Sequence, residues 1–292
     1  MKLTLPLLFI SIMFISAVHC KDKKKPGGST ALAAEKELVT ATGSYDLSKP
    51  VIRKLHRRLN EISGINYLDK EKFAAEEDEN GNVYILDFKT GDIDNTFNFG
   101  PPGDYEDIVT LKDYYYLLNS NGDIYKVDRK NPAAATTKIF KFGKPDTEFE
   151  SLYADADGKR LVLICKACSG NGHNTSIPAF GFDLQKETYS NDPVFSIEEA
   201  PVRKLLQIGK GKFKPSSAAI HPIEKKLYVL CSTGRLLLVC SLSGVVESAW
   251  PLELSLYNQP EGITFAPNGD MYISNEAGES KATILKLAYL KK

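Results

Sequence analysis

The chain has 292 residues, in which 37 Lys and Arg balance 37 Asp and Glu, so that its formal net charge is zero. A chain of this length can form one large domain with a substantial hydrophobic core. Because neither charge sign dominates, no global field favours nucleic acid or an acidic membrane surface, and we predict no nucleic-acid partner.

The amino terminus has the pattern of an export leader. Lys2 is followed by an apolar run over residues 3–18, which has the length of a signal-peptide core and is short for a membrane span. The run ends at His19 and Cys20, and a lysine-rich and glycine-rich stretch follows. This arrangement resembles a bacterial lipoprotein signal, in which Cys20 becomes the lipidated first residue. His19 departs from the small residue usual before that cysteine, and an ordinary secretory peptide is the alternative.

The lipoprotein interpretation implies a domain organisation and a location. We expect residues 1–19 to be the signal peptide, residues 20–44 to be a flexible tether without a core pattern, and residues 45–292 to form the folded domain. Lipidated Cys20 would anchor the protein to a membrane of the bacterial cell envelope, at the outer membrane or the periplasmic face. Several acyl chains on one cysteine anchor stably, because each buried CH2 adds roughly 0.8 kcal/mol.

Strand patterns dominate the chain beyond the tether. Short β-branched or aromatic runs are bounded by pairs such as Asn-Gly, Asp-Gly and Thr-Gly, which supply the positive φ that tight hairpins need. Helix patterns are confined to residues 31–38 and to a turn or two near residues 198–206. The sequence therefore predicts an all-β domain. The clearest strand runs cover residues 83–86, 114–118, 161–164, 227–230 and 236–239.

Five short segments repeat one design, and each is followed by a strand, a glycine turn and another strand. A period of about 40–45 residues is typical of propeller blades. The second positions of the five segments are separated by 43, 44, 66 and 45 residues, which fits that period with one longer interval. The segments are ISGI at residues 62–65, YEDI at 105–108, FESL at 149–152, PSSA at 215–218 and PEGI at 260–263.

The number of strands in each repeat predicts how the ring closes. The first repeat carries strands at residues 72–75, 82–87 and 95–99 after its motif, whereas the last repeat ends one strand short. Residues 51–55 have no blade of their own, so they can complete the last sheet and remove its open edge. We therefore predict a five-bladed β-propeller in which an N-terminal strand closes the last blade. The 66-residue interval indicates one blade with an insertion between about residues 170 and 214.

Several motifs, taken in order, resemble those of the SdiA-regulated propeller family. The resemblance covers about residues 45–289. It implies a five-bladed propeller with a calcium site, distantly similar to NHL-repeat propellers and often found in exported or membrane-anchored bacterial proteins. The motifs are NEISGI at residues 60–65, DYED at 104–107, FKPS at 213–216 with IHP at 220–222, and QPEGITF at 259–265 followed by YISNE at 272–276.

The same resemblance implies four calcium ligands. The family's acidic positions fall on Glu106, Glu150 and Glu261, and Glu276 matches a further acidic position after a second strand. Calcium takes roughly six to eight oxygen ligands, which carboxylates and carbonyls from several blades can provide. The alternative is that these glutamates cap strand starts by accepting backbone N–H bonds.

The chain departs from the family pattern at three positions. Ser63 and Ser216 occupy two of the motif positions that are acidic in the other repeats. Lys166 is expected to follow the second strand of the third repeat, where its ammonium group can replace the charge of a cation locally.

Other constellations are weaker. DADG at residues 155–158 resembles the start of an EF-hand loop, but Lys166 stands where the closing Glu should be, so we predict a hairpin turn. Cys165 and Cys168 have CxxC spacing without the second pair or the histidine of a zinc site. Cys231 and Cys240 lie in one predicted hairpin but not opposite each other. Free thiols and disulfides are both compatible with these four cysteines in an exported protein.

Catalytic motifs are missing from the sequence. It has no GxSxG, HExxH, Walker or dinucleotide pattern, and the expected mature chain has His56, His173 and His221 as its histidines. We therefore expect a membrane-anchored, calcium-binding propeller that acts as a binding or scaffolding module for an unknown protein or small-molecule ligand. The alternative is a calcium-dependent esterase or phosphoesterase, because a metal in the channel can polarise an ester or phosphate oxygen.

Overall fold

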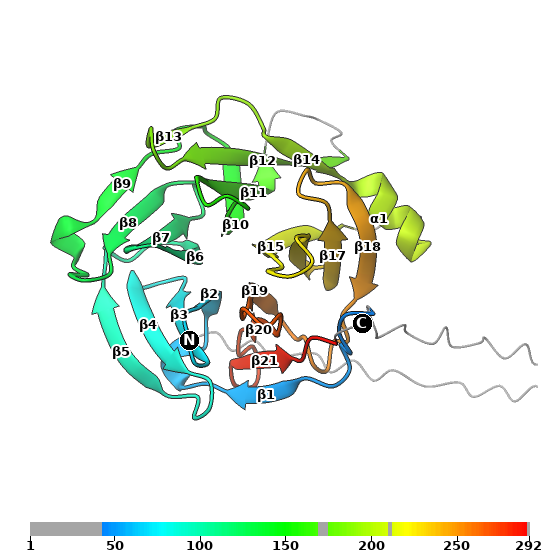
Figure 1. The fold of residues 1–292 in the computed structure, drawn as a ribbon, viewed down its shortest axis with the longest axis horizontal. Helices are drawn as coiled ribbons and strands as arrows, with labels where there is room; N and C mark the ends of the chain where they lie inside the picture. Colours follow the sequence, from blue (N-terminus) through cyan, green and yellow to red (C-terminus); the bar gives the residue numbers. More distant parts are fainter. Residues whose placement is uncertain (1–42, 169–174, 210–211, 291–292) are drawn as a thin grey trace, which may run out of the picture. The chain divides into compact units, whose positions relative to one another are not determined.

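The computed structural model describes residues 43–168, 175–209 and 212–290. Strands in these residues form five sheets that follow one another around a central axis (Figure 1). This arrangement confirms the predicted all-β, five-bladed β-propeller. The expected signal peptide, Cys20, most of the expected tether, the helix pattern at residues 31–38 and His173 lie outside the described residues.

Each sheet is one blade of antiparallel strands, ordered from the axis outward. Blade 1 comprises β2 (Ile62–Tyr67), β3 (Lys72–Glu77), β4 (Asn82–Asp87) and β5 (Ile93–Asn98). Blade 2 comprises β6 (Tyr105–Leu111), β7 (Tyr114–Asn119), β8 (Ile124–Asp128) and β9 (Lys138–Phe140). Two 3-10 turns, η1 (Arg57–Leu59) and η2 (Ala134–Thr136), lie outside the sheets.

The remaining three blades follow the same order, and the last one takes its outer strand from the amino terminus. Blade 3 comprises β10 (Thr147–Ala154), β11 (Arg160–Cys168), β12 (Ser176–Asp183), β13 (Thr188–Tyr189) and β14 (Phe195–Glu198), and helix α1 (Glu199–Leu206) follows it. Blade 4 comprises β15 (Lys214–Ile220), β16 (Leu227–Thr233), β17 (Leu236–Cys240) and β18 (Val246–Pro251). Blade 5 comprises β19 (Pro260–Phe265), β20 (Met271–Asn275), β21 (Thr283–Leu287) and β1 (Val51–Lys54).

The innermost strands form a ring in which each packs against the next, from β2 through β6, β10, β15 and β19 back to β2. The register of each innermost strand shifts at its repeat motif, for example between Tyr105 and Asp107 and between Phe149 and Ser151. Comparable shifts lie between Ile62 and Ile65, Pro215 and Ser217, and Pro260 and Ile263. A bulge of this kind leaves one residue outside the ladder and re-aims its side chain. The repeat seen in the sequence is therefore a repeated bulge beside the axis.

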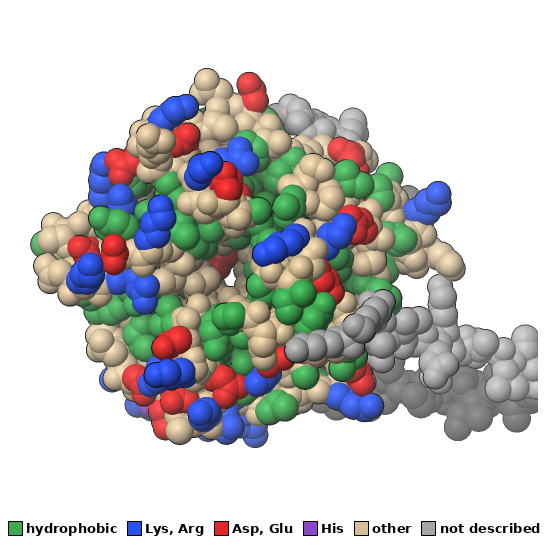
Figure 2. All heavy atoms as spheres, in the orientation of Figure 1, with side chains coloured by type: hydrophobic (Ala, Val, Ile, Leu, Met, Phe, Trp, Pro, Cys, Tyr) green, Lys and Arg blue, Asp and Glu red, His purple; other side chains and the backbone are tan. Residues whose placement is uncertain are grey.

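The hydrophobic core lies between blades rather than at the axis. Five clusters of buried apolar side chains each join one blade to its neighbour. Between blades 5 and 1, the ring centroids of Phe73 and Tyr272 are 4.8 Å apart in an edge-on arrangement, which is favourable for aromatic pairs. This packing fixes the blades around the axis. Figure 2 shows Lys and Arg interspersed with Asp and Glu on one face, in keeping with the balanced composition.

The N-terminal strand closes the ring as predicted. β1 pairs with β21 in antiparallel register, from Val51 opposite Lys286 to Lys54 opposite Thr283. The residues before β1 also pack into blade 5: Tyr45 is fully buried, and its hydroxyl donates to the Gly269 carbonyl at 2.6 Å. Both ends of the domain are thus fastened in one blade, which leaves that sheet without an open outer edge on β21.

The third blade differs from the sequence expectation. The region predicted as an insertion, from about residue 170 to residue 214, holds β12, β13 and β14, which are strands of the blade itself. Pro178 and Gly181 within β12 break the strand pattern in the sequence, which is why this strand was not expected. The helix pattern near residues 198–206 is confirmed as α1. Lys166 lies within β11 rather than after it.

The cysteines separate into two kinds. Cys165 and Cys168 form a disulfide at the end of β11, with their Cα atoms 6.1 Å apart. Cys231 and Cys240 are buried free thiols, opposite Leu236 and Leu227 respectively, as the hairpin register predicted. The DADG segment is a hairpin turn with Gly158 at φ 64°, also as predicted. No helix in the described part of the chain has the length and apolarity needed to span a bilayer.

Removing the closing segment should destabilise the domain strongly. A chain that starts at residue 58 loses β1 together with the buried Tyr45, Leu47 and Leu55, relative to one that starts at residue 43. Each such side chain contributes about 1.5–3 kcal/mol of burial, against a total stability of roughly 5–15 kcal/mol. Urea unfolding followed by circular dichroism should show a large fall in the midpoint, or loss of the folded state.

The matched control for this truncation is Ile52→Ala. Ile52 lies on β1 but is 47% exposed, so its truncation should change the free energy of unfolding by less than about 0.5 kcal/mol. Equal urea midpoints for the chains starting at residues 43 and 58 would contradict the shared blade.

Candidate functional site

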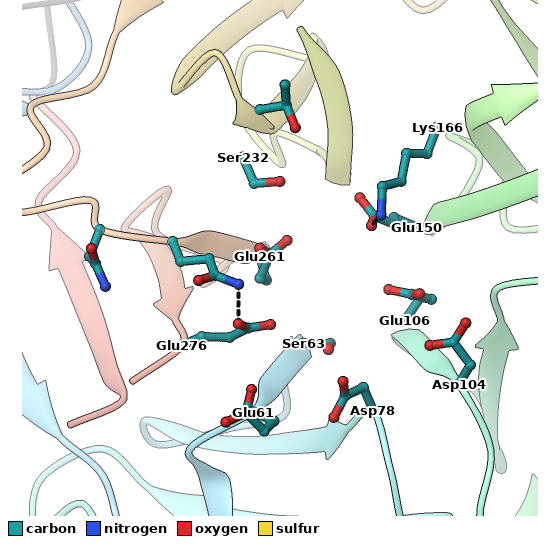
Figure 3. Close-up of a pocket in the computed structure, with 13 residues that line it drawn as sticks. Glu61, Ser63, Asp78, Asp104, Glu106, Glu150, Lys166, Ser232, Glu261 and Glu276 are labelled. Carbon is teal, nitrogen blue, oxygen red and sulfur yellow. Dashed lines mark hydrogen bonds and ion pairs between the residues drawn. The ribbon is translucent and has the colours of Figure 1, made fainter. Parts of the chain in front are cut away.

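An acidic cavity of about 530 Å³ opens where the innermost strands begin (Figure 3). Its wall carries seven carboxylates and a single lysine, Lys166. The four residues expected to bind calcium all lie in this wall, although they come from three different blades. The carboxylates are Glu61, Asp78, Asp104, Glu106, Glu150, Glu261 and Glu276.

The bulges explain three of these positions. Glu106 and Glu150 are the residues left outside the ladder in blades 2 and 3, and Glu261 lies in the corresponding gap of blade 5. Ser63 lines the cavity from the same position in blade 1. Ser216 of blade 4 is not among the lining residues, and its hydroxyl donates instead to the Pro260 carbonyl at 2.9 Å.

Three of the seven carboxylates were not predicted as site residues: Asp78, and the pair Glu61 and Asp104, which share one position in their repeats. Glu61 and Asp104 each precede the bulge position of their strand by two residues, which places both on the same side of the strand. The Gln259 side chain holds the equivalent position in blade 5 and also lines the cavity. A search for acidic residues at this spacing would have found Glu61 and Asp104.

Asp78 and Glu276 enter the wall from the ends of second strands. The Asp78 backbone N–H donates to the Glu61 carbonyl at 3.4 Å, and the Glu276 N–H donates to the Gln259 carbonyl at 3.0 Å. These equivalent bonds hold the two side chains at matching places in blades 1 and 5. The Gln259 side-chain amide also donates to a Glu276 carboxylate oxygen.

Lys166 supplies the positive charge of the wall. Its ammonium nitrogen lies 2.8 Å from Glu148 Oε1. It forms a second ion pair with Glu150 Oε1, and Figure 3 shows the side chains of Lys166 and Glu150 next to each other. The other Glu150 oxygen, Oε2, is buried and has no hydrogen-bond partner among the described residues. A buried carboxylate oxygen without a donor is costly, so Glu150 is half-satisfied in this arrangement.

Crowding in the cavity raises the pKa values of its carboxylates. Burial, followed by the charge of Asp104, raises the pKa of Glu106 to about 9. Burial is also the largest cause for Glu261, whose pKa is raised to about 7, and for Glu276, whose pKa is raised to about 8 by burial and the charge of Glu261. Lys166 acts in the opposite direction on all three. The cavity therefore favours either protons or a further cation.

A second polar layer lies below the cavity and connects the blades. Asp107 is buried, and its carboxylate accepts the Leu152 backbone N–H at 2.8 Å and the Ser217 hydroxyl at 3.0 Å, which joins blades 2, 3 and 4. Glu76 accepts the Gly64 N–H at 2.5 Å. Asp107 and Glu76 are therefore the carboxylates that accept backbone N–H groups near the bulges. Glu150 is paired with Lys166 instead, and Glu276 with Gln259.

The glycine of one motif reflects how closely the innermost strands approach. A Cβ atom at Gly64 would lie 2.6 Å from the Cα of Asp107 in the next blade, so a side chain there would push the strands apart. The close approach is what brings the bulge residues of neighbouring blades to one cavity.

The present positions of the side chains do not form a ready metal site. In residues 43–168, 175–209 and 212–290, no three His, Cys, Asp or Glu side chains converge closely enough to hold a metal ion. The chemistry of the wall, hard carboxylate oxygens from several blades, nevertheless suits Ca²⁺, which also takes water and carbonyl ligands. Calcium binding by Glu106, Glu150, Glu261 and Glu276 stays a prediction.

Comparisons with known proteins support the fold. No protein-family model and no curated protein matches the chain, so the resemblance to the SdiA-regulated family stays a prediction. Among solved structures, a luciferin-regenerating enzyme is 10% identical, over 82% of this chain and 95% of that chain, with a TM-score of 0.50. A protein of unknown function from Bacteroides thetaiotaomicron is 13% identical, over 74% of this chain and 52% of that chain, with a TM-score of 0.50. At such identities the similarity concerns the fold alone.

The raised pKa values predict how stability depends on pH. Glu106, Glu261 and Glu276 bind protons in the folded state up to about pH 9, 7 and 8, whereas in the unfolded chain they release them near an ordinary value of about 4.3. The folded state therefore holds more protons across this window, and its free energy of unfolding should fall as pH rises from about 5 to 9. Urea unfolding of residues 43–292 with chelator at pH 5 and pH 8 measures this.

Burial also raises the pKa values of Glu76 and Asp107, so these two groups change the free energy of unfolding with pH in the same direction. Glu106→Gln isolates the contribution of the cavity from theirs. This variant should lose less stability than wild type between pH 5 and pH 8. Asp157→Asn, in an exposed turn, should follow the wild type. An unchanged pH dependence in Glu106→Gln would show that this carboxylate is not crowded.

Proposed function

We propose that the protein is a calcium-binding propeller of the cell envelope, anchored through lipidated Cys20, that acts as a binding or scaffolding module. The observation that carries the calcium part is the cavity wall, in which seven carboxylates face one lysine. The propeller fold is consistent with a binding module, because its blades hold side chains from distant segments around one rigid opening.

The ligand set follows from what each carboxylate already contacts. Glu106, Glu261 and Glu276 line the cavity with pKa values raised by burial and by neighbouring carboxylates, so a cation among them would relieve unfavourable charge. Glu150 adds a buried oxygen that lacks a donor. Small shifts of these side chains and bound water would complete an oxygen shell of the kind that calcium accepts.

Lys166 competes with the metal in this proposal. Its ammonium group pairs with Glu150, one of the four proposed calcium ligands, and its positive charge also lowers the pKa of Glu106. Calcium must then displace Lys166 from Glu150 or bind beside it, and the remaining Glu148 contact gives the lysine an alternative partner. Lys166 therefore lowers the affinity of the site for calcium, although it pairs with only one of the four proposed ligands.

A second candidate, a calcium-dependent esterase or phosphoesterase, is favoured by one feature. In this candidate Glu106 is the acid rather than a metal ligand. Burial and the charge of Asp104 raise its pKa to about 9, which keeps a neutral carboxylic acid at the cavity wall near pH 7, where it can donate a proton to a leaving group. The metal would polarise the ester or phosphate oxygen. Against this, His221 is buried beside the Tyr45 hydroxyl, at 2.6 Å, and is not a lining residue of the cavity. A screen of ester and phosphoester substrates with calcium separates the two candidates.

Calcium should stabilise the domain. At about 100 times its dissociation constant it should raise the free energy of unfolding by roughly 2.7 kcal/mol. Glu106→Gln, Glu150→Gln and Glu261→Gln should each weaken this effect while keeping the fold, because each removes one anionic ligand. Lys166→Met should have the opposite effect and tighten calcium binding, because it removes the competing cation. Calorimetric titration and thermal unfolding with calcium or chelator measure these differences.

Asp157→Asn is the matched control, because it removes a carboxylate from a hairpin turn that is not part of the cavity wall. It should leave the calcium effect unchanged. The metal assignment fails if calcium and chelator leave the wild-type melting temperature unchanged and elemental analysis finds no bound ion.

The anchoring part has a separate test. Cys20→Ser, expressed in the native host, should lose labelling by a fatty-acid analogue and move from the membrane fraction to the soluble envelope fraction. A wild-type protein that carries no label, with membrane retention unchanged in Cys20→Ser, would remove the lipoprotein interpretation and leave the calcium site untouched.

A further inference from the structure

A second cavity, of about 670 Å³, lies beside the acidic one, between blades 3 and 4. Its wall is built from the residues leading into β10, the end of β11, the start of β12, Pro193, the first turn of α1 and the residues leading into β15. Lys166 and the Cys165–Cys168 disulfide belong to this wall. Its volume falls within the range of about 300–1,000 Å³ that is usual for small-molecule pockets.

The floor of this cavity is aromatic. Phe180 and Phe213 line it and are almost fully buried, with 7% and 4% of their surfaces exposed. Phe180 is held by packing against Phe142, with ring centroids 5.4 Å apart. The Cys165–Cys168 disulfide at the end of β11 links two residues of the adjacent wall covalently. The floor is therefore preformed, which lowers the entropic cost of binding a flat apolar group.

The rim of the same cavity is cationic. Lys144, Lys166, Lys212 and Lys214 line it, whereas Glu199 is its carboxylate and is already paired with Arg203. Lys144 lies over the Phe180 ring, with its ammonium nitrogen 4.6 Å from the centroid. We call this cavity, defined by the four lysines above Phe180 and Phe213, the lysine pocket.

Among the described residues, Lys166 is the one of these four lysines that pairs with a carboxylate. Lys166 is engaged with Glu148 and Glu150, and Lys144 donates to the Asn191 carbonyl at 2.5 Å. Within the described residues, neither Lys212 nor Lys214 forms an ion pair with a carboxylate. The ammonium groups of the lysines around the apolar floor repel one another, and an anion placed among them would be attracted by each of them.

We propose that the lysine pocket binds a small organic anion, a carboxylate or a phosphate ester with a flat apolar body. The acid group lies toward Lys212 and Lys214, and the apolar body rests on Phe180 and Phe213. Lysine suits either acid group, because its ammonium is a compact charge without the fixed fork geometry of arginine. This site is separate from the calcium site and does not require the metal.

The test is calorimetric titration of residues 43–292 in the presence of chelator, with four probes, three of which share one naphthyl body. These are 2-naphthoate, 2-naphthyl phosphate, the neutral 2-naphthamide and inorganic phosphate. At least one naphthyl anion should bind with 1:1 stoichiometry, and 2-naphthamide and inorganic phosphate should each bind at least tenfold more weakly. The stronger of the two anions identifies the acid group that the pocket prefers.

Matched charge variants locate the binding. Lys212→Ala with Lys214→Ala should weaken the naphthyl anion at least tenfold, and the single variant Lys212→Ala, at an exposed position, should weaken it in the same direction. Lys54→Ala with Lys281→Ala removes the same charge from exposed positions of blade 5 and should leave the affinity unchanged. Thermal unfolding confirms that each variant is folded.

Three results would overturn the proposal. The first is equal affinity for 2-naphthoate, 2-naphthyl phosphate and 2-naphthamide, or saturable binding by none of them. The second is equal loss of affinity in the two double variants. The third is anion binding that requires added calcium and is lost in Glu261→Gln, which would place the anion on a channel metal instead. The calcium proposal is tested without these probes, so the two can fail independently.

Discussion

The close approach of five innermost strands around one axis is the constraint on which the rest of this structure depends. Each strand bulges at its repeat motif, and in four of the five blades the bulge residue lines the cavity. Carboxylates that are far apart in the sequence are thereby confined to one volume. Two like charges 4 Å apart repel by about 4 kcal/mol at an effective dielectric constant of about 20. The domain tolerates this because aromatic packing between the blades holds the ring, and because Lys166 and bound protons reduce the charge.

Much of the fold follows from local sequence patterns. The spacing of the bulge motifs predicted the number of blades. The run at residues 51–55 predicted the closure by β1, because it belongs to no repeat and the last repeat is the one sheet that lacks a strand. The third blade was harder to predict. β12 contains Pro178 and Gly181, which are poor strand formers, and β11 continues beyond the predicted run at residues 161–164 into residues 165–168, which hold a cysteine pair and no β-branched residue. In both strands tertiary pairing overrides local propensity.

The sites were less predictable than the fold. Glu106, Glu150, Glu261 and Glu276 were found because they follow the repeat, and Glu61 and Asp104 were missed although they lie two residues before a bulge. The ion pair between Lys166 and Glu150 joins two strands of one blade across a bulge, which no spacing rule specifies. The lysine pocket gathers side chains from several separate segments between residues 144 and 214, so it has no sequence signature.

Among the residues that the structure describes, Lys166 alone lies in the walls of both cavities, one of which is lined mainly by carboxylates and the other mainly by lysines. Its pairing with Glu150 keeps its charge on the acidic side. A cation that replaces it there would leave Lys166 with Glu148 as its partner, and its charge would then be more available to an anion beside Lys212 and Lys214. An anion in the lysine pocket would in turn draw Lys166 away from Glu150 and expose that carboxylate to a cation. Because such coupling is reciprocal, each ligand would increase the affinity for the other by the same factor. A lysine shared between two cavities thus connects the calcium proposal with the anion proposal, through the position of one side chain and without any movement of the blades.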